Sequence, residues 1–183
     1  MTKLFSILLI IFSIANAEAS NKNKIIFNLK KIENLKFDFE QNISGKIEKG
    51  RCILKYPKKI YCEYNSSNNK ILVSNGRSVV IKTDIGSFYR YPLEETPLNF
   101  ILDKNFLLKN IENLNEEIID NKFIVFTLRK NDLNINILFD KNNFNIAGWK
   151  VLDIYQNVSL TTLSNITTNQ KIKSGTFKLP EFN

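Results

Sequence analysis

The segment from Gly50 to Leu102 contains four short apolar stretches, and two turn signals divide them into pairs. The first pair meets at Pro57 and the second at Asn75-Gly76. Asn-Gly suits a two-residue type I′ turn, because that turn needs positive φ at both central positions. Such a turn pairs Leu72 with Val79, and the pattern leaves open which face of this hairpin points inward. Two consecutive hairpins predict an antiparallel sheet.

Two segments carry helical signals. Thr96 is a candidate N-cap with Pro97 at the first helical position, so an apolar helix is expected to follow the hairpins. Residues 24–34 repeat apolar positions at helical spacing and predict a short amphipathic helix.

Short strands are predicted over most of the remaining chain. Their expected ranges are 35–40, 47–56, 60–64, 70–74, 77–83, 87–91, 116–120, 122–130, 133–139, 144–155 and 158–168. Many short strands with turn signals between them are typical of one antiparallel sheet. The predicted fold is therefore mainly β with a few helices, built on a single, strongly curved sheet.

The first residues predict an export signal. Lys3 precedes an apolar run from Leu4 to Ile14, and Ala15-Asn16-Ala17 fits the small-x-small cleavage rule. The run is short for a membrane span, which needs about 20 residues. An uncleaved anchor is the alternative, but the polar residues after Ala17 favour cleavage there. We therefore expect a signal peptide over residues 1–17, a single domain over residues 18–183 and a periplasmic location.

Composition argues against several classes of function. The chain contains no His, which removes the usual general base, His-based triads and most zinc sites. Composition therefore argues against His-based catalysis, and we expect no metal and no cofactor. The net charge of +8 comes from scattered basic residues, and export argues against a nucleic-acid partner. Acidic residues such as Asp103 are interpreted as solvated charges without partners.

A series of short motifs, in order along the chain, resembles the LolA family of periplasmic outer-membrane lipoprotein carriers. The motifs are F-D-F-E-Q from Phe37, G-R-C-I-L-K-Y-P from Gly50, I-L-V-S-N-G-R from Ile71, T-P-L-N-F-I-L from Thr96, A-G-W-K-V-L-D from Ala147 and T-F-K-L-P from Thr176. The match is nearer to the short, divergent members typical of alphaproteobacteria.

This resemblance implies an unclosed β-barrel whose helical lid covers a hydrophobic cavity. It implies a chaperone that binds the acyl chains of lipoproteins and ferries them from the inner to the outer membrane. The implied partners are acylated lipoproteins, the inner-membrane lipoprotein-releasing ABC transporter and an outer-membrane acceptor lipoprotein, and the carrier is expected to act as a monomer. Alternatives are a carrier of another lipid or glycolipid and, in a different class, a periplasmic lipid-modifying enzyme. The absence of His and of a G-x-S-x-G motif argues against the enzyme.

The resemblance implies that one apolar strand face and the lid helix form the acyl-chain site. Its predicted residues are Phe37, Phe39, Leu54, Tyr56, Ile60, Tyr64, Leu98, Ile101 and Leu102. The alternative is an ordinary packed core, which needs the same residue types. Trp149 is interpreted as a core residue. Tyr56 stands where many family members have an Arg tied to lid closure, so control by Arg does not carry over, although a Tyr hydroxyl can still hydrogen-bond to the lid.

The two cysteines fall on the same face of adjacent predicted strands. The turn near Pro57 places Cys52 and Cys62 about opposite each other. A cross-strand disulfide and a pair of buried thiols both fit this geometry. Export into an oxidising compartment favours the disulfide.

Overall fold

One antiparallel sheet organises the computed structural model, which describes residues 20–66, 68–130, 133–152 and 157–182. The strands are β1 (Asn34–Ile43), β2 (Lys46–Lys55), β3 (Lys59–Tyr64), β4 (Ile71–Asn75), β5 (Ser78–Lys82), β6 (Phe88–Pro92), β7 (Glu117–Ile119), β8 (Phe123–Lys130), β9 (Leu133–Asp140), β10 (Ile146–Leu152) and β11 (Val158–Thr168). The predicted signal peptide, residues 1–17, lies outside the described residues.

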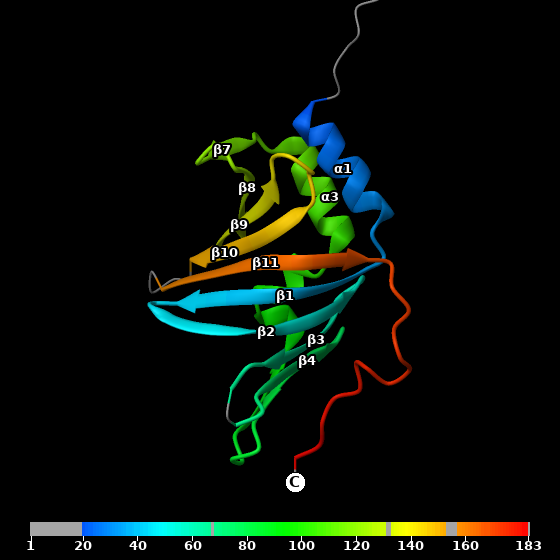
Figure 1. The fold of residues 1–183 in the computed structure, drawn as a ribbon, viewed down its shortest axis with the longest axis vertical. Helices are drawn as coiled ribbons and strands as arrows, with labels where there is room; N and C mark the ends of the chain where they lie inside the picture. Colours follow the sequence, from blue (N-terminus) through cyan, green and yellow to red (C-terminus); the bar gives the residue numbers. More distant parts are fainter. Residues whose placement is uncertain (1–19, 67, 131–132, 153–156, 183) are drawn as a thin grey trace, which may run out of the picture.

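The order across the sheet is β6-β5-β4-β3-β2-β1-β11-β10-β9-β8-β7. Each strand follows its chain neighbour except at the centre, where β1 lies between β2 and β11. The strands β6 and β7 stand at opposite edges and do not pair, so the sheet does not close on itself. The sheet is strongly curved (Figure 1). The predicted mainly-β fold with an unclosed, curved antiparallel sheet is confirmed.

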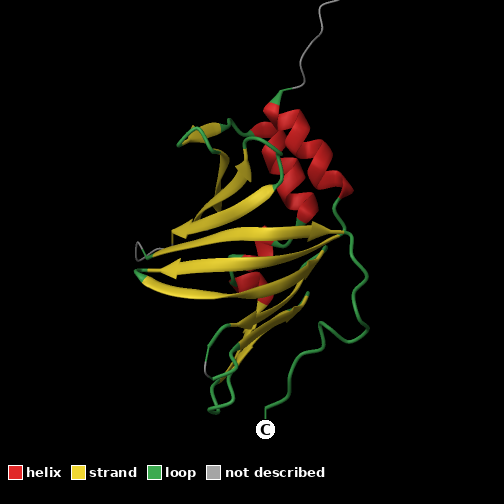
Figure 2. Cartoon of the chain, viewed as in Figure 1, coloured by secondary structure: helices red, strands yellow, loops and turns green. Residues whose placement is uncertain are grey.

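Helices lie on the concave side and at one end of the sheet. They are α1 (Asn21–Lys31), the 3₁₀ helix η1 (Leu93–Glu95), α2 (Leu98–Ile101) and α3 (Lys104–Asn113). Figure 2 shows α1 and α3 side by side at one end, while α2 lies inside the curve of the sheet. We call residues 93–102, which contain η1 and α2, the lid. Among the described residues, no helix is long and apolar enough to span a bilayer.

Local capping explains where the helices begin. In α1, Ser20 Oγ accepts a hydrogen bond from the Asn23 N–H at 3.3 Å, so the helix starts three residues before the predicted Lys24. In α3, Asp103 Oδ1 accepts from the Phe106 N–H at 3.0 Å. The sequence analysis missed α3, although Asp103 as N-cap followed by Leu107 and later Ile111 is a sufficient signal.

The lid differs from the predicted single capped helix. Thr96 does not cap, because its hydroxyl donates to the Leu93 carbonyl at 2.8 Å. The Leu93 carbonyl also accepts the Thr96 N–H at 3.0 Å, which closes the 3₁₀ turn. The chain therefore forms two short helical pieces around Thr96 and Pro97, and α2 has only four residues.

The predicted register of the β4–β5 hairpin is wrong by one turn position. Leu72 pairs with Ile81 instead of Val79, because the turn residues are Gly76-Arg77 and not Asn75-Gly76. Asn75 Oδ1 accepts from the Arg77 N–H at 2.9 Å and from the Ser78 N–H at 3.1 Å. Gly76 alone takes positive φ, at 98°, as a turn with glycine at its first central position requires.

The strand predicted over 144–155 begins later than expected. Phe144 has φ of 58° and donates its N–H to the Asp140 carbonyl at 2.8 Å, so it belongs to the turn before β10. Residues 153–156 of that prediction lie outside the described residues.

Candidate functional site

A cavity of about 520 Å³ opens on the concave side of the sheet beneath the lid. Its apolar wall comprises Phe37, Phe39, Ile43, Ile60, Tyr64, Leu72, Ile81, Pro97, Leu98, Ile101, Leu133, Trp149, Val151 and Val158, together with Cys52 and Cys62. These residues come from strands on both sides of the β1–β11 pair and from the lid. An interior wall of this composition is suited to an apolar ligand.

The structure brings most of the predicted ligand-binding residues into this wall. Phe37, Phe39, Ile60 and Tyr64 from the sheet, and Leu98 and Ile101 from the lid, line the cavity. The Phe39 and Tyr64 rings meet edge to face with centroids 5.0 Å apart. Gly50 lies opposite both residues, and a Cβ there would stand 2.7 Å from the Phe39 ring, so glycine makes room for the pair.

Three predicted residues belong to the packed core instead of the cavity wall. Leu54 and Leu102 are fully buried and Tyr56 is 8% exposed, and all are part of the main apolar cluster. Leu54 and Tyr56 share the strand face of Cys52. They follow Cys52 in the sequence and lie near the C-terminal end of the lid. The Lys58 N–H donates to the Leu102 carbonyl at 2.8 Å, which joins the end of the lid to the turn after β2.

The end of the lid is held by Lys58. Its Nζ lies 3.4 Å from Asp103 Oδ2, so Asp103 has two partners and is not the unpartnered charge that the sequence suggested. The Tyr56 hydroxyl has no hydrogen-bond partner in the described residues, which corrects the expectation of a Tyr56–lid hydrogen bond. Burial raises the pKa of this hydroxyl, so it stays protonated.

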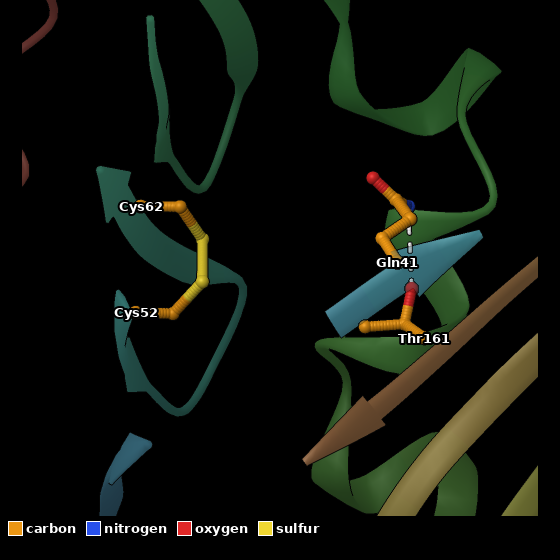
Figure 3. The surroundings of a disulfide bond; sticks show 4 residues. All are labelled: Gln41, Cys52, Cys62 and Thr161. Atoms are coloured by element: carbon orange, nitrogen blue, oxygen red, sulfur yellow. Dashed lines mark hydrogen bonds between the residues drawn. A yellow bond between two sulfur atoms is a disulfide. The ribbon is translucent and has the colours of Figure 1, made fainter. Parts of the chain in front are cut away.

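Cys52 and Cys62 form a disulfide across the β2–β3 pair, with Cα atoms 4.1 Å apart. Figure 3 shows the bond, with Gln41 and Thr161 drawn in the same view. Both sulfur-bearing residues are buried and line the cavity, so the disulfide is part of its wall. Closing this short loop contributes about 2–3 kcal/mol in the loop-entropy account.

The cavity also contains apolar residues that the sequence analysis did not assign to it. Leu72 and Ile81 settle the question of the β4–β5 hairpin, because their face points into the cavity. Trp149 is buried in the core as predicted, and it also lines the cavity and meets the Phe37 ring edge to face at 6.5 Å. Sequence periodicity could not reveal this contact, since it depends on β11 placing β10 near β1.

Polar residues form a row across the inner face near the cavity mouth. Gln41 on β1 lies opposite Glu48 on β2 and Thr161 on β11. Glu48 Oε2 lies 2.7 Å from Lys70 Nζ, and Lys70 lies over the Tyr64 ring at 4.1 Å. We call Gln41, Glu48, Lys70, Ser159 and Thr161 the polar row. The sequence analysis missed it because these residues come from distant segments.

Burial and neighbouring charges shift the pKa values of Glu48 in the polar row and of Tyr64 beside it. Burial alone would raise the pKa of Glu48, but hydrogen bonds and charge from Lys70 and Lys46 together outweigh burial, so the net pKa lies below the usual value. Burial and then the Glu48 charge raise the pKa of Tyr64 to about 12. In the described part of the chain, no cluster of His, Cys, Asp or Glu could hold a metal ion.

Comparison with known proteins agrees with this geometry. Residues 30–180 match the family described as outer membrane lipoprotein carrier protein LolA. The chain belongs to the LolA family. Members of this family are periplasmic carrier proteins. A comparison with curated protein sequences gave no match.

Solved structures resemble this LolA-family chain at low identity. A LolA superfamily protein from Nitrosomonas europaea is 10% identical, covers 88% of this chain and 99% of its own, and has a TM-score of 0.46. An uncharacterized conserved protein from Thermus thermophilus is 8% identical, with 85% and 93% covered and a TM-score of 0.51. A putative outer membrane lipoprotein-sorting protein domain from Vibrio parahaemolyticus is 8% identical, with 85% and 95% covered and a TM-score of 0.46.

Proposed function

We propose that this protein is a periplasmic carrier that holds the acyl chains of lipoproteins in its cavity and ferries them from the inner to the outer membrane. The observation that carries the proposal is the apolar cavity under the lid, in a chain of the LolA family. The carrier would receive its cargo from the inner-membrane lipoprotein-releasing ABC transporter. It would deliver the cargo to an outer-membrane acceptor lipoprotein.

The physical reason for such a carrier is the free energy of exposing acyl chains to water. Transfer of each methylene group from water to an apolar site gains about 0.8 kcal/mol, so an unprotected acyl chain does not leave a membrane readily. A wall made of Phe37, Phe39, Ile60, Leu72 and Trp149 offers the required apolar surface.

The same cavity also supports a second candidate, a carrier of another lipid or glycolipid. The wall recognises apolar chains and does not by itself distinguish their origin. Mass spectrometry of what co-extracts with the protein from its own periplasm separates these ligands. A lipid-modifying enzyme has less support, since the chain has no His to act as a general base.

The test uses a matched pair of Ile→Asp variants four positions apart in the chain. Ile81 lines the cavity, whereas Ile85 is 76% exposed. Ile81→Asp places a charge against the acyl site, where an unpaired carboxylate is unfavourable. We expect it to lower the release of a triacylated lipoprotein from inner-membrane vesicles at least about tenfold, because a charge in an apolar site costs more than one factor of ten in affinity.

Ile85→Asp should release the lipoprotein as the wild type does. Circular dichroism verifies that both variants are folded. If Ile81→Asp is folded and releases lipoprotein at the wild-type level, the acyl chains do not occupy this cavity and the proposal is wrong.

A further inference from the structure

The polar row places hydrogen-bonding groups inside a cavity whose wall is otherwise mostly apolar. Gln41 follows Phe37 and Phe39 on the inward face of β1, and Ile43 continues that face toward the exposed rim. Gln41, Ser159 and Thr161 all line the cavity. The deeper wall is apolar, so a ligand with its chain inside has its first polar group near this row.

The Gln41 amide lies with its nitrogen on two hydroxyls of the row. Its Nε2 donates to Ser159 Oγ at 3.3 Å and to Thr161 Oγ1 at 3.2 Å. Figure 3 shows the nitrogen directed to Thr161 and the oxygen turned away from it. The Gln41 oxygen accepts no hydrogen bond from the described residues, and neither hydroxyl donates one to them. One acceptor and two donors are therefore available to a ligand.

The charged members of the row do not favour an anionic ligand. Lys70 is held by the Glu48 carboxylate, and its side chain is only 21% exposed. Glu95, on the lid, adds a carboxylate to the cavity lining. Glu48 also pairs with Lys46 at 3.2 Å, so the two ammonium groups are balanced by the carboxylates of Glu48 and Glu95, and an anionic head group finds no net positive charge here. The row is suited to a polar but uncharged group.

We propose that Gln41, with Ser159 and Thr161, recognises a secondary amide that joins an acyl chain to the rest of the ligand. A secondary amide carries one N–H donor for the Gln41 oxygen and one carbonyl acceptor for a hydroxyl of Thr161 or Ser159. An ester offers only the acceptor and leaves the Gln41 oxygen unpaired once water is displaced, which is unfavourable. This inference rests on the proposed function and names the linkage that the carrier selects.

The test compares two uncharged probes of equal length, N-propyl dodecanamide and propyl dodecanoate, in displacing a fluorescent apolar dye from the full-length protein. Gln41→Leu replaces the polar amide by an apolar side chain of similar size. We expect this variant to lose about tenfold in affinity for the amide probe, as the loss of one buried hydrogen bond predicts, while its affinity for the ester stays the same or improves.

Gln170→Leu is the matched control, because the Gln170 side chain is exposed and donates to the Thr168 carbonyl away from the cavity. It should keep the wild-type preference. Thr161→Val is a second variant, which keeps the side-chain volume and removes one hydroxyl, and should shift the preference in the same direction. Dodecanoyl glycinamide and N-dodecanoyl ethanolamine then show whether an acylated peptide or an N-acyl lipid is the preferred source of the amide.

The outcomes separate this inference from the proposed function. If both probes displace the dye, and Gln41→Leu and Thr161→Val leave their relative affinities unchanged, the cavity binds acyl chains without reading the linkage, and the inference is wrong. If neither probe displaces the dye from the wild type, the cavity does not bind acyl chains and the proposed function fails as well.

Discussion

The sheet has two regions that differ in their interiors, because side chains fill one and a cavity lies in the other. In the packed region, Ile25 and Leu29 of α1 and Leu107 and Ile111 of α3 are at most 1% exposed, and they belong to one apolar cluster with Phe126 and Phe139. In the hollow region, the lid covers the cavity with a helix of only four residues. Figure 1 shows the two longer helices at one end of the sheet.

The difference shows how one fold separates stability from binding. Two helices of ten or more residues bury an apolar stripe each and fill the space above the strands. The lid cannot fill the space below it, because η1 and α2 are too short to present such a stripe. We therefore expect the packed region to contribute more folding free energy than the hollow region.

The largest expected effect comes from making the same truncation in both regions. Leu107→Ala opens a void in the packed region and should lower the free energy of unfolding by about 2–5 kcal/mol. Leu98→Ala removes a half-buried side chain that faces the cavity, and it should cost about 1 kcal/mol or less, since no closed void forms. Urea unfolding followed by circular dichroism gives both values. Equal losses would show that the cavity is as tightly packed as the core.

A smaller effect is expected from enlarging one Ile in each region. Ile135 is fully buried, so Ile135→Phe should overpack its surroundings and cost about 1–3 kcal/mol of unfolding free energy. Ile81→Phe has empty space to enter, and it should leave stability almost unchanged while it weakens the binding of an apolar dye. The measurements are urea unfolding and dye titration for both variants. A destabilised Ile81→Phe variant with wild-type dye binding would contradict the comparison.

The smallest effect concerns the charge pair at the cavity mouth. The pKa of Glu48 is lower in the folded protein than its usual 4.5, so its contribution to stability is present above that value and is lost as the pH falls through the folded pKa. We expect about 1 kcal/mol or less, as for other partly exposed pairs. Unfolding curves for the wild type and Glu48→Gln between about pH 6 and pH 3 isolate this contribution. Identical pH profiles would show that Glu48 contributes none of it.

Much of the fold follows from local sequence signals. The strand ranges near 46–64 and 158–168 were predicted to within a residue or two, because alternating apolar positions mark a half-buried strand. The hairpin at Asn75 was shifted because its side chain makes two backbone hydrogen bonds, and these outweigh the general preference of Asn-Gly. Turn chemistry of this kind depends on contacts that a residue pattern does not contain.

The candidate site was only partly predictable, for a different reason. Phe37, Phe39 and Ile60 were found because one strand face of the first half already suggested a wall. Trp149 and Thr161 were not assigned to the cavity, because their positions beside it depend on the pairing of β11 with β1 and with β10. Leu54 was assigned to the cavity wall but lies in the packed core. Periodicity gives the face of a strand, but it does not say where along the strand the cavity ends.

The central position of β1 has a consequence for how the chain reaches its folded state. Its partner β11 pairs Gln41 with Thr161, so one of the two seams that hold β1 joins residues far apart in the sequence. Bringing such distant segments together is entropically unfavourable and slow compared with closing the hairpins on either side. The middle of the sheet can be completed only after the last strand has been synthesised. Until β11 is made, β1 lacks one of its two neighbours, and the sheet keeps an open edge at its centre.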